Sequence, residues 1–236
     1  MLSATCLADL QDRVRDIEQR GREQVSSETR PIETAWTLLP RRRLHEWFAP
    51  PESPPLCVLV DAAFRATEGG GHAFWIGRTC WPHPRVLVRA GEDGRRLLER
   101  SVFLDPSPKD RLWALDLVLR CEGASAVVAD GTGLDMNATR RLQLAAEAGR
   151  AWIALARPIV ELAIPSAAAF RWEARADPTG DGVTHPRWAV TLRRCKDAGA
   201  GDTEAEHWNL EWRSDAGVVP LPAAVVDRPA ASRQAG

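Results

Sequence analysis

Short apolar runs that alternate with helical patterns between residues 44 and 158 most constrain what this chain can fold into. The runs lie at 44–48, 72–76, 97–104, 125–130 and 151–156, and helical patterns at 56–67, 109–121 and 138–149 separate them. Strands that alternate with helices in this way form a mostly parallel sheet covered by helices. The runs SAVVAD and AWIALA are almost wholly apolar, as in strands buried on both faces. The predicted fold class is therefore α/β, while residues 81–94 fit a helix or a strand.

The pattern of residues changes after Ser166. The segments AFRWEARA (169–176), RWAVTLRRC (187–195) and HWNLEWRS (207–214) alternate apolar and polar residues, and turn-rich stretches separate them. Such alternation is typical of antiparallel strands with one solvated face. We therefore expect three antiparallel strands that extend the parallel sheet at its C-terminal edge, without a separate C-terminal domain.

Both ends of the chain differ from this core. An apolar stripe on a charged N-terminal helix is formed by Leu7, Leu10, Val14 and Ile17, which recur at steps of three and four residues. Such a stripe either packs on its own domain or docks on a partner. The C-terminal residues are rich in Pro and Ala, which is typical of disorder. The expected organisation is a helix and linker at 1–30, a core domain at 31–219 and a disordered tail at 220–236.

Charge and cysteine usage exclude several classes of function. The formal net charge is −1, which argues against a globally basic binder of nucleic acid or membranes. The five cysteines include no CxxC pair, so we expect neither a zinc site nor a disulfide framework, and a reduced cytoplasmic location is the simplest interpretation. No run is long and apolar enough to span a bilayer. We expect no metal, no cofactor and no membrane association.

The loop APPESPPLC follows the first predicted strand of the core, where many nucleotide-binding proteins hold phosphate. A working phosphate loop, GxxxxGK[ST], uses backbone amides, a lysine and a hydroxyl for this purpose. The corresponding residues here are Pro50, Pro51, Glu52, Ser53, Pro54 and Pro55. Proline has no N–H to donate, and no lysine precedes Lys109. We therefore expect this loop not to bind nucleotide.

Asp130 ends the run SAVVAD, where P-loop ATPases place an aspartate that helps to hold magnesium. Asp130 is thus Walker-B-like in its position. Because no functional phosphate loop is expected opposite, and because Asp before Gly is itself a turn signal, the favoured interpretation is that Asp130 caps the turn DGTG.

Clusters of arginine are candidate DNA contacts. Arginine binds phosphate bidentately, and proteins that bind single strands combine it with aromatic side chains such as Trp36, Trp47 and Trp188 here. No signature of a known DNA-binding fold accompanies the clusters, so DNA contact is left as an open alternative. The clustered residues are Arg41, Arg42, Arg43, Arg140, Arg141, Arg193 and Arg194.

Several longer segments resemble the ImuA family. They are KDRLWALDLVLRCEGASAVVADG (109–131), LDMNATRRLQLAAEAGRAWIALARP (134–158), PSAAAFRWEA (165–174), RWAVTLRRC (187–195) and HWNLEW (207–212). The most specific part is TRRLQLAAEA followed by a strand and RP. ImuA proteins are RecA-like accessory factors of a bacterial translesion-synthesis cassette within the DNA-damage (SOS) response. Their partners are the ImuB pseudo-polymerase and a DnaE-type polymerase.

A more distant resemblance is to RecA itself. RRRLHEWFAPPESPP resembles the RecA strand that leads into GPESSGKT, with the PES retained and the glycine, lysine and threonine lost. GRT (77–79) stands where RecA-like ATPases place a catalytic glutamate, and Arg157 stands where RecA has a glutamine that reports nucleotide state. The segments that match the two DNA-binding loops of RecA, 131–137 and 157–166, are short. The resemblance implies a RecA-like core that lacks a functional P-loop and is not an enzyme.

The resemblance implies a non-catalytic accessory protein of damage-induced translesion DNA synthesis. Such a protein recruits an ImuB-type pseudo-polymerase and a DnaE-type error-prone polymerase, with RecA as a third candidate partner. The candidate docking segments are the N-terminal apolar stripe and the C-terminal tail, because both lie outside the core. Two alternatives stay open: a SulA-like cell-division inhibitor, which shares the lysine-free RecA-like plan, and a divergent ATPase that depends on Asp130.

Overall fold

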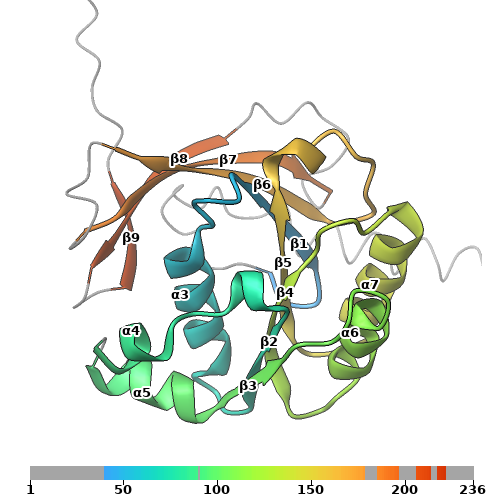
Figure 1. The fold of residues 1–236 in the computed structure, drawn as a ribbon, viewed down its shortest axis with the longest axis horizontal. Helices are drawn as coiled ribbons and strands as arrows, with labels where there is room; N and C mark the ends of the chain where they lie inside the picture. Colours follow the sequence, from blue (N-terminus) through green and yellow to red (C-terminus); the bar gives the residue numbers. More distant parts are fainter. Residues whose placement is uncertain (1–39, 90, 179–184, 197–205, 214–216, 222–236) are drawn as a thin grey trace, which may run out of the picture. The chain divides into compact units, whose positions relative to one another are not determined.

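The computed structural model describes residues 40–89, 91–178, 185–196, 206–213 and 217–221. Within these ranges the chain forms one nine-stranded sheet with helices on both faces (Figure 1). The N-terminal stripe of Leu7, Leu10, Val14 and Ile17 and most of the expected tail lie outside the described residues.

The first half of the described chain alternates strands with helices, and the second half is built of strands. The elements are β1 (Leu44–Ala49), α3 (Leu56–Thr67), β2 (His72–Ile76), η1 (Arg78–Cys80), α4 (Pro84–Arg89), α5 (Gly91–Glu99), β3 (Ser101–Leu104), α6 (Arg111–Leu119), β4 (Ala124–Asp130), α7 (Met136–Ala148), β5 (Trp152–Pro158), η2 (Ile159–Glu161), β6 (Phe170–Asp177), β7 (Arg187–Cys195), β8 (Glu206–Arg213) and β9 (Gly217–Leu221).

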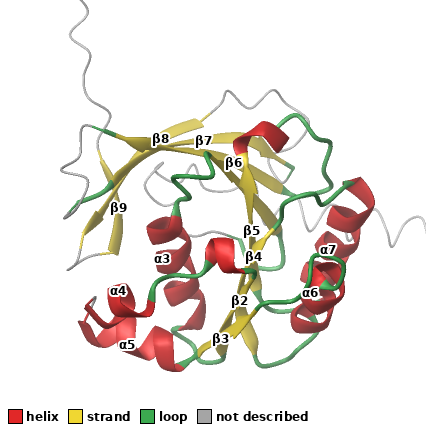
Figure 2. Ribbon diagram, in the orientation of Figure 1, coloured by secondary structure: helices red, strands yellow, loops and turns green. Residues whose placement is uncertain are grey.

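The strand order of the sheet is β3-β2-β4-β5-β1-β6-β7-β8-β9. Strands β1 to β5 pair in parallel, and β6 to β9 pair antiparallel with one another, so the sheet has a parallel and an antiparallel half (Figure 2). This confirms the predicted α/β class with antiparallel strands added at one edge. The parallel strands, however, fill one side of the sheet rather than its centre.

Three details of the antiparallel half differ from the sequence expectation. The first late strand, β6, pairs in parallel with β1 before the antiparallel strands begin. A fourth late strand, β9, was not predicted, and it takes in Pro220 and Leu221 from the segment expected to be a tail. Proline has no backbone N–H to donate to a neighbouring strand. Because β9 is the last strand in the sheet, no further strand lies beyond Pro220 to need such a donor.

Two differences concern the parallel half. Residues 81–94, which fitted a helix or a strand, contain α4 and the start of α5. The apolar run predicted as a strand at 97–104 begins inside α5, and only its last residues form β3. Leu97 is buried because it lies on the inner side of a helix. A short apolar run cannot by itself distinguish a strand from one side of a buried helix.

The helices divide between the two faces of the sheet. Helices α3, α4 and α5 lie on one face, and α6 and α7 lie on the other (Figure 1). The antiparallel half curves over α3, and the Val218 amide of β9 donates to Oδ1 of Asp61 on α3 at 3.2 Å. None of the helices in the described ranges is both long and apolar enough to cross a membrane.

Local sequence determines where α7 begins and ends. The Asp135 side chain accepts a hydrogen bond from the Ala138 amide and caps the first turn. At the other end, a Cβ on Gly149 would lie 2.5 Å from the carbonyl oxygen of Leu119. The close approach of the α7 C-terminus to α6 therefore requires glycine at this position.

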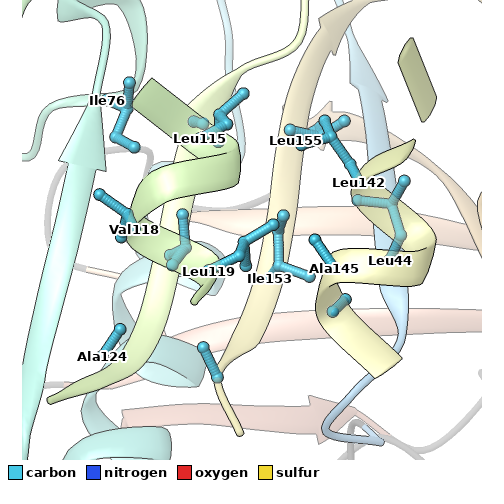
Figure 3. Close-up of a cluster of buried hydrophobic side chains, with 14 of the residues drawn as sticks. Leu44, Ile76, Leu115, Val118, Leu119, Ala124, Leu142, Ala145, Ile153 and Leu155 are labelled. Carbon is cyan, nitrogen blue, oxygen red and sulfur yellow. The ribbon is translucent and has the colours of Figure 1, made fainter. Parts of the chain in front are cut away.

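The main apolar cluster fills the space between the sheet and helices α6 and α7 (Figure 3). Leu115 and Leu119 of α6 and Leu142 of α7 point toward Ile153 and Leu155 of β5 in Figure 3, and all of them are buried. The recurrence of leucine at four-residue steps on α6 matches the helical repeat, which is why this side of α6 faces the sheet.

Truncation of Leu142 should destabilise the protein far more than truncation of its neighbour Leu144. Leu142→Ala leaves a cavity in the core and should lower the free energy of unfolding by about 2–5 kcal/mol. Leu144 is 58% exposed, so Leu144→Ala should change it by about 0.5 kcal/mol or less. Urea unfolding followed by circular dichroism measures both values. Equal losses in the two variants would contradict the packing of α7 described above.

Candidate functional site

The loop between β1 and α3 lies at the carboxyl edge of the parallel strands, where α/β proteins commonly bind ligands. Its backbone donors are few, because four of its residues are prolines. Of the remaining amides, that of Ser53 donates to the carbonyl of Pro50 at 3.0 Å, and that of Leu56 donates to the carbonyl of Pro54 at 2.8 Å. Neither the loop nor the first turn of α3 carries a lysine or an arginine.

The Asp130 carboxylate at the end of β4 is occupied by donors of the protein itself. Oδ1 accepts the amide of Thr132 at 2.9 Å, as in an aspartate that caps its own turn. Oδ2 pairs with Nη2 of Arg111 at 3.3 Å. Gly77 leaves room for this side chain, since a Cβ on Gly77 would lie 2.8 Å from the Cβ of Asp130. Asp130 therefore closes the turn and anchors α6.

The thiol of Cys80 is buried close to the Asp130 carboxylate. Its Sγ lies 3.1 Å from the carbonyl oxygen of Gly77 and 3.5 Å from that of Val128. Burial, together with the nearby negative charge of Asp130, raises the pKa of Cys80 to about 12. The thiol is therefore neutral at physiological pH and is a poor nucleophile.

A buried ionic cluster joins the three central strands at the same edge of the sheet; its members are Glu46, Arg157, Glu161 and Arg171, hereafter the Glu46 cluster. Oε1 of Glu46 accepts from Nη1 of Arg157 at 2.6 Å, and Oε2 accepts from Nε of Arg171 at 2.9 Å. The side chains of Glu46 and Arg157 are wholly buried. Both guanidinium groups also lie over the ring of Phe48, at 5.6 and 4.6 Å from its centroid.

The Glu46 cluster also holds the two loops that follow β4 and β5. Arg157 donates through Nε and Nη2 to Oε2 of Glu161, at 2.9 and 2.7 Å, and through Nη2 to the Leu134 carbonyl at 2.9 Å. Oε1 of Glu161 accepts the Gly133 amide at 3.0 Å. The loops at 131–137 and 157–166, which the sequence resemblance predicted to correspond to the DNA-binding loops of RecA, are therefore tied to each other and to β1 by contacts within the protein.

The sequence alone did not reveal the Glu46 cluster. Glu46 is separated from Arg157 by 111 residues and from Arg171 by 125 residues, and neither spacing forms a motif. One signal was present, because Glu46 is the single charged residue in the apolar run LHEWF. A charge inside a buried strand requires a partner, since an unpaired buried carboxylate is very costly.

The candidate DNA contacts lie on three different elements. Arg41, Arg42 and Arg43 precede β1, Arg140 and Arg141 lie on α7, and Arg193 and Arg194 end β7. Most of these side chains are engaged inside the protein. Their partners are the Ala66 carbonyl for Arg41, Glu147 for Arg43, Asp116 for Arg141, Glu173 for Arg193 and the Ser166 carbonyl for Arg194. Five of the seven candidate arginines are therefore held by partners within the protein, and DNA contact by them stays untested.

The solvated side of the antiparallel strands carries two further arginine–glutamate clusters. Glu173 pairs with Arg175 and with Arg193, while Glu211 pairs with Arg187 and with Arg213. Hydrogen bonds from Arg213 and Arg187 lower the pKa of Glu211. The Glu173–Arg193 pair joins β6 to β7 and the Glu211–Arg187 pair joins β8 to β7, so these two pairs stabilise the register of the strands. Within the described ranges, no three His, Cys, Asp or Glu side chains are grouped to hold a metal ion.

Comparison with known proteins supports the sequence resemblance. No family model matches the chain. The chain is 29% identical over 185 residues to Protein ImuA of Caulobacter vibrioides (strain NA1000 / CB15N), across 71% of this chain and 72% of that protein. Protein ImuA of strain ATCC 19089 / CIP 103742 / CB 15 of the same species matches equally. The resemblance to the ImuA family is thereby confirmed.

Comparison of structures confirms the fold. The RadB recombinase matches with a TM-score of 0.60 at 12% sequence identity, over 81% of this chain and 97% of that chain. The core is therefore RecA-like, with the strand order and the antiparallel edge described above.

Removal of one partner from the Glu46 cluster should be strongly destabilising. Arg157→Met leaves Glu46 and Glu161 without their shared counter-charge and should lower the free energy of unfolding by about 3–5 kcal/mol. The control Arg120→Ala removes a pair whose arginine is 60% exposed and should cost about 1 kcal/mol or less. Adding Glu46→Gln to Arg157→Met should recover part of the loss. Equal urea midpoints for Arg157→Met and Arg120→Ala would be inconsistent with a structural role for the cluster.

Proposed function

We propose that this chain, a RecA-like relative of the ImuA proteins, is a non-catalytic accessory protein of damage-induced translesion DNA synthesis. In this proposal it acts by recruiting protein partners, an ImuB-type pseudo-polymerase first and a DnaE-type error-prone polymerase and RecA after it. The observation that carries the proposal is the Glu46 cluster. It holds, through internal ion pairs and hydrogen bonds, the loops that resemble the two DNA-binding loops of RecA in sequence position.

The environment of the former phosphate loop supports the same proposal. Four prolines remove amide donors, and two other amides of the loop are engaged in turns. Asp130, which would be needed to help hold magnesium, already accepts from Thr132 and pairs with Arg111. A triphosphate would therefore find few amide donors, and the Asp130 carboxylate that would help to hold its metal ion already has partners within the protein. Function then rests on surfaces that the RecA-like core presents to other proteins.

The full chain should not bind Mg-ATP. Isothermal titration at high protein concentration should give no saturable heat, because the loop lacks both the lysine and the amide donors. The matched variant is Asp130→Asn, which keeps an oxygen for the Thr132 amide and removes the carboxylate charge. A saturable heat in the unaltered chain that disappears in Asp130→Asn would favour the divergent ATPase instead.

The N-terminal stripe should contribute to partner binding. Deletion of residues 1–21 should weaken co-purification with the ImuB-type protein of the same organism by about tenfold or more, because an apolar helix face commonly carries much of the binding energy. The double substitution Leu10→Asp/Val14→Asp tests the stripe itself, and Asp12→Asn in the same predicted helix is its control. Undiminished binding after the deletion would remove the N-terminal helix from the proposal. Absence of binding by the unaltered chain would contradict the proposed function.

A further inference from the structure

Two large apolar side chains on α6 are exposed although the other side of this helix is buried. Trp113 is 63% exposed and Leu117 is 55% exposed, whereas Leu115 and Leu119 are buried in the core. Residues four apart lie on the same side of a helix, so Trp113 and Leu117 form one apolar ridge. Leu144 of the neighbouring helix α7 is 58% exposed. Grouped exposed apolar side chains mark interaction surfaces, and tryptophan is the residue most typical of their energetic centre.

Three arginines on or next to α6 and α7 accompany this apolar ridge: Arg120, Arg140 and Arg141. Asp116 of α6 pairs with Arg120 at 3.2 Å and with Arg141 of α7 at 3.0 Å, so both guanidinium groups lie beside one carboxylate of α6. Each of the two arginine side chains is more than half exposed. Arg140 is exposed, and no carboxylate of the described residues pairs with it. Glu147 lies toward the end of α7 and is engaged by Gln143. On the outer side of α6 and α7, the arginine side chains therefore outnumber the described carboxylates that have no partner.

None of these exposed side chains is needed for the core. The sheet-facing side of α6 and α7 supplies the buried residues, and the Asp135 cap starts α7 independently of the outer side. The exposed side is not covered by any described segment, since α3, α4 and α5 lie on the opposite face of the sheet (Figure 1). Burial of Trp113 and Leu117 against a partner would therefore gain apolar area without disturbing the fold.

We propose that the outer side of α6 and α7 binds an amphipathic helix of a protein partner that carries Asp or Glu beside its apolar stripe. This α6–α7 face comprises Trp113, Leu117, Leu144, Arg120, Arg140 and Arg141. The apolar stripe of the partner packs on the Trp113–Leu117 ridge, because anchors one turn apart match the repeat of a second helix. Its acidic flank faces the arginines. The inference rests on the proposed function, since it names the surface by which the core binds its partner.

A helix fits this face better than a nucleic acid does. The aliphatic side chains of Leu117 and Leu144 have neither a hydrogen-bond donor nor a positive charge with which to bind a phosphate. The Asp116 carboxylate among the arginines would repel a phosphate. An acidic helix satisfies both parts of the surface, because its apolar side chains cover the ridge and its carboxylates meet the outer guanidinium groups. Trp113 and the arginines are then the expected centres of the binding energy.

Substitution of the ridge tests the proposal, with the full chain and the ImuB-type protein as the probe. Trp113→Ala and Leu117→Glu should each raise the Kd measured by surface plasmon resonance by about tenfold or more. Val88→Glu is the matched control, since Val88 is an apolar residue of α4 that is 41% exposed on the other face of the sheet. It should leave the Kd within about twofold of the unaltered value, as expected for a residue outside an interface. Urea unfolding of all three variants shows whether the fold is retained.

The charge of the partner is tested separately. Arg140→Glu should weaken binding, and its effect should diminish as salt is raised, because the face attracts an acidic flank. A photo-crosslinking residue at position 117 then identifies the occupant. Crosslinks to an acidic, apolar-striped segment of the ImuB-type protein support the proposal. Crosslinks to nucleic acid or to another copy of this chain would overturn it.

The two proposals fail in different ways. If the unaltered chain binds the ImuB-type protein and the Trp113 and Leu117 variants bind equally well, the α6–α7 face is wrong and the recruiting function stands. If the unaltered chain does not bind the ImuB-type protein at all, the recruiting function and the α6–α7 face both fall.

Discussion

The carboxylate of Glu46 is the charge on which the arrangement of the central strands depends. Burial of a lone carboxylate costs several kcal/mol, so β1 can carry Glu46 only where arginines from other strands reach it. Arg157 of β5 and Arg171 of β6 supply these partners from the two neighbours of β1. Buried ion pairs add little net stability, but they penalise every packing that leaves one partner alone. The Glu46 cluster thus favours one arrangement of this edge of the sheet.

The same cluster orders the carboxyl edge of the RecA-like core through contacts within the protein. Loops at the carboxyl edge of parallel strands commonly bind ligands, and some switch loops become ordered only when their ligand binds. Here Glu161 and Arg157 bind the loop backbone at Gly133 and Leu134, so the protein supplies its own counter-charges. A fold does not imply a function, so the role of this core has to be argued from its own sites and surfaces. The exposed ridge of Trp113 and Leu117 is the best-defined of these surfaces.

Much of the parallel half could be predicted because its signals are local. Strands β4 and β5 are continuous apolar runs, and α7 is bounded by Asp135 and Gly149, so neighbouring residues suffice to recognise them. Prediction was wrong where the local signal was ambiguous. The apolar run at 97–104 is shared between the inner side of α5 and strand β3, and β9 contains a proline that argues against a strand unless it lies at an edge.

The sequence by itself determined the α/β class, the antiparallel extension and the absence of a GxxxxGK[ST] motif after β1, because periodicity, prolines and a missing lysine are properties of adjacent residues. Only the tertiary structure decided that Glu46 meets Arg157 and Arg171, that both Asp130 oxygens are occupied, and that Trp113 and Leu117 face outward. The physical reason is that ion pairing and burial depend on distances in space. Residues more than a hundred positions apart become neighbours only once the sheet has formed.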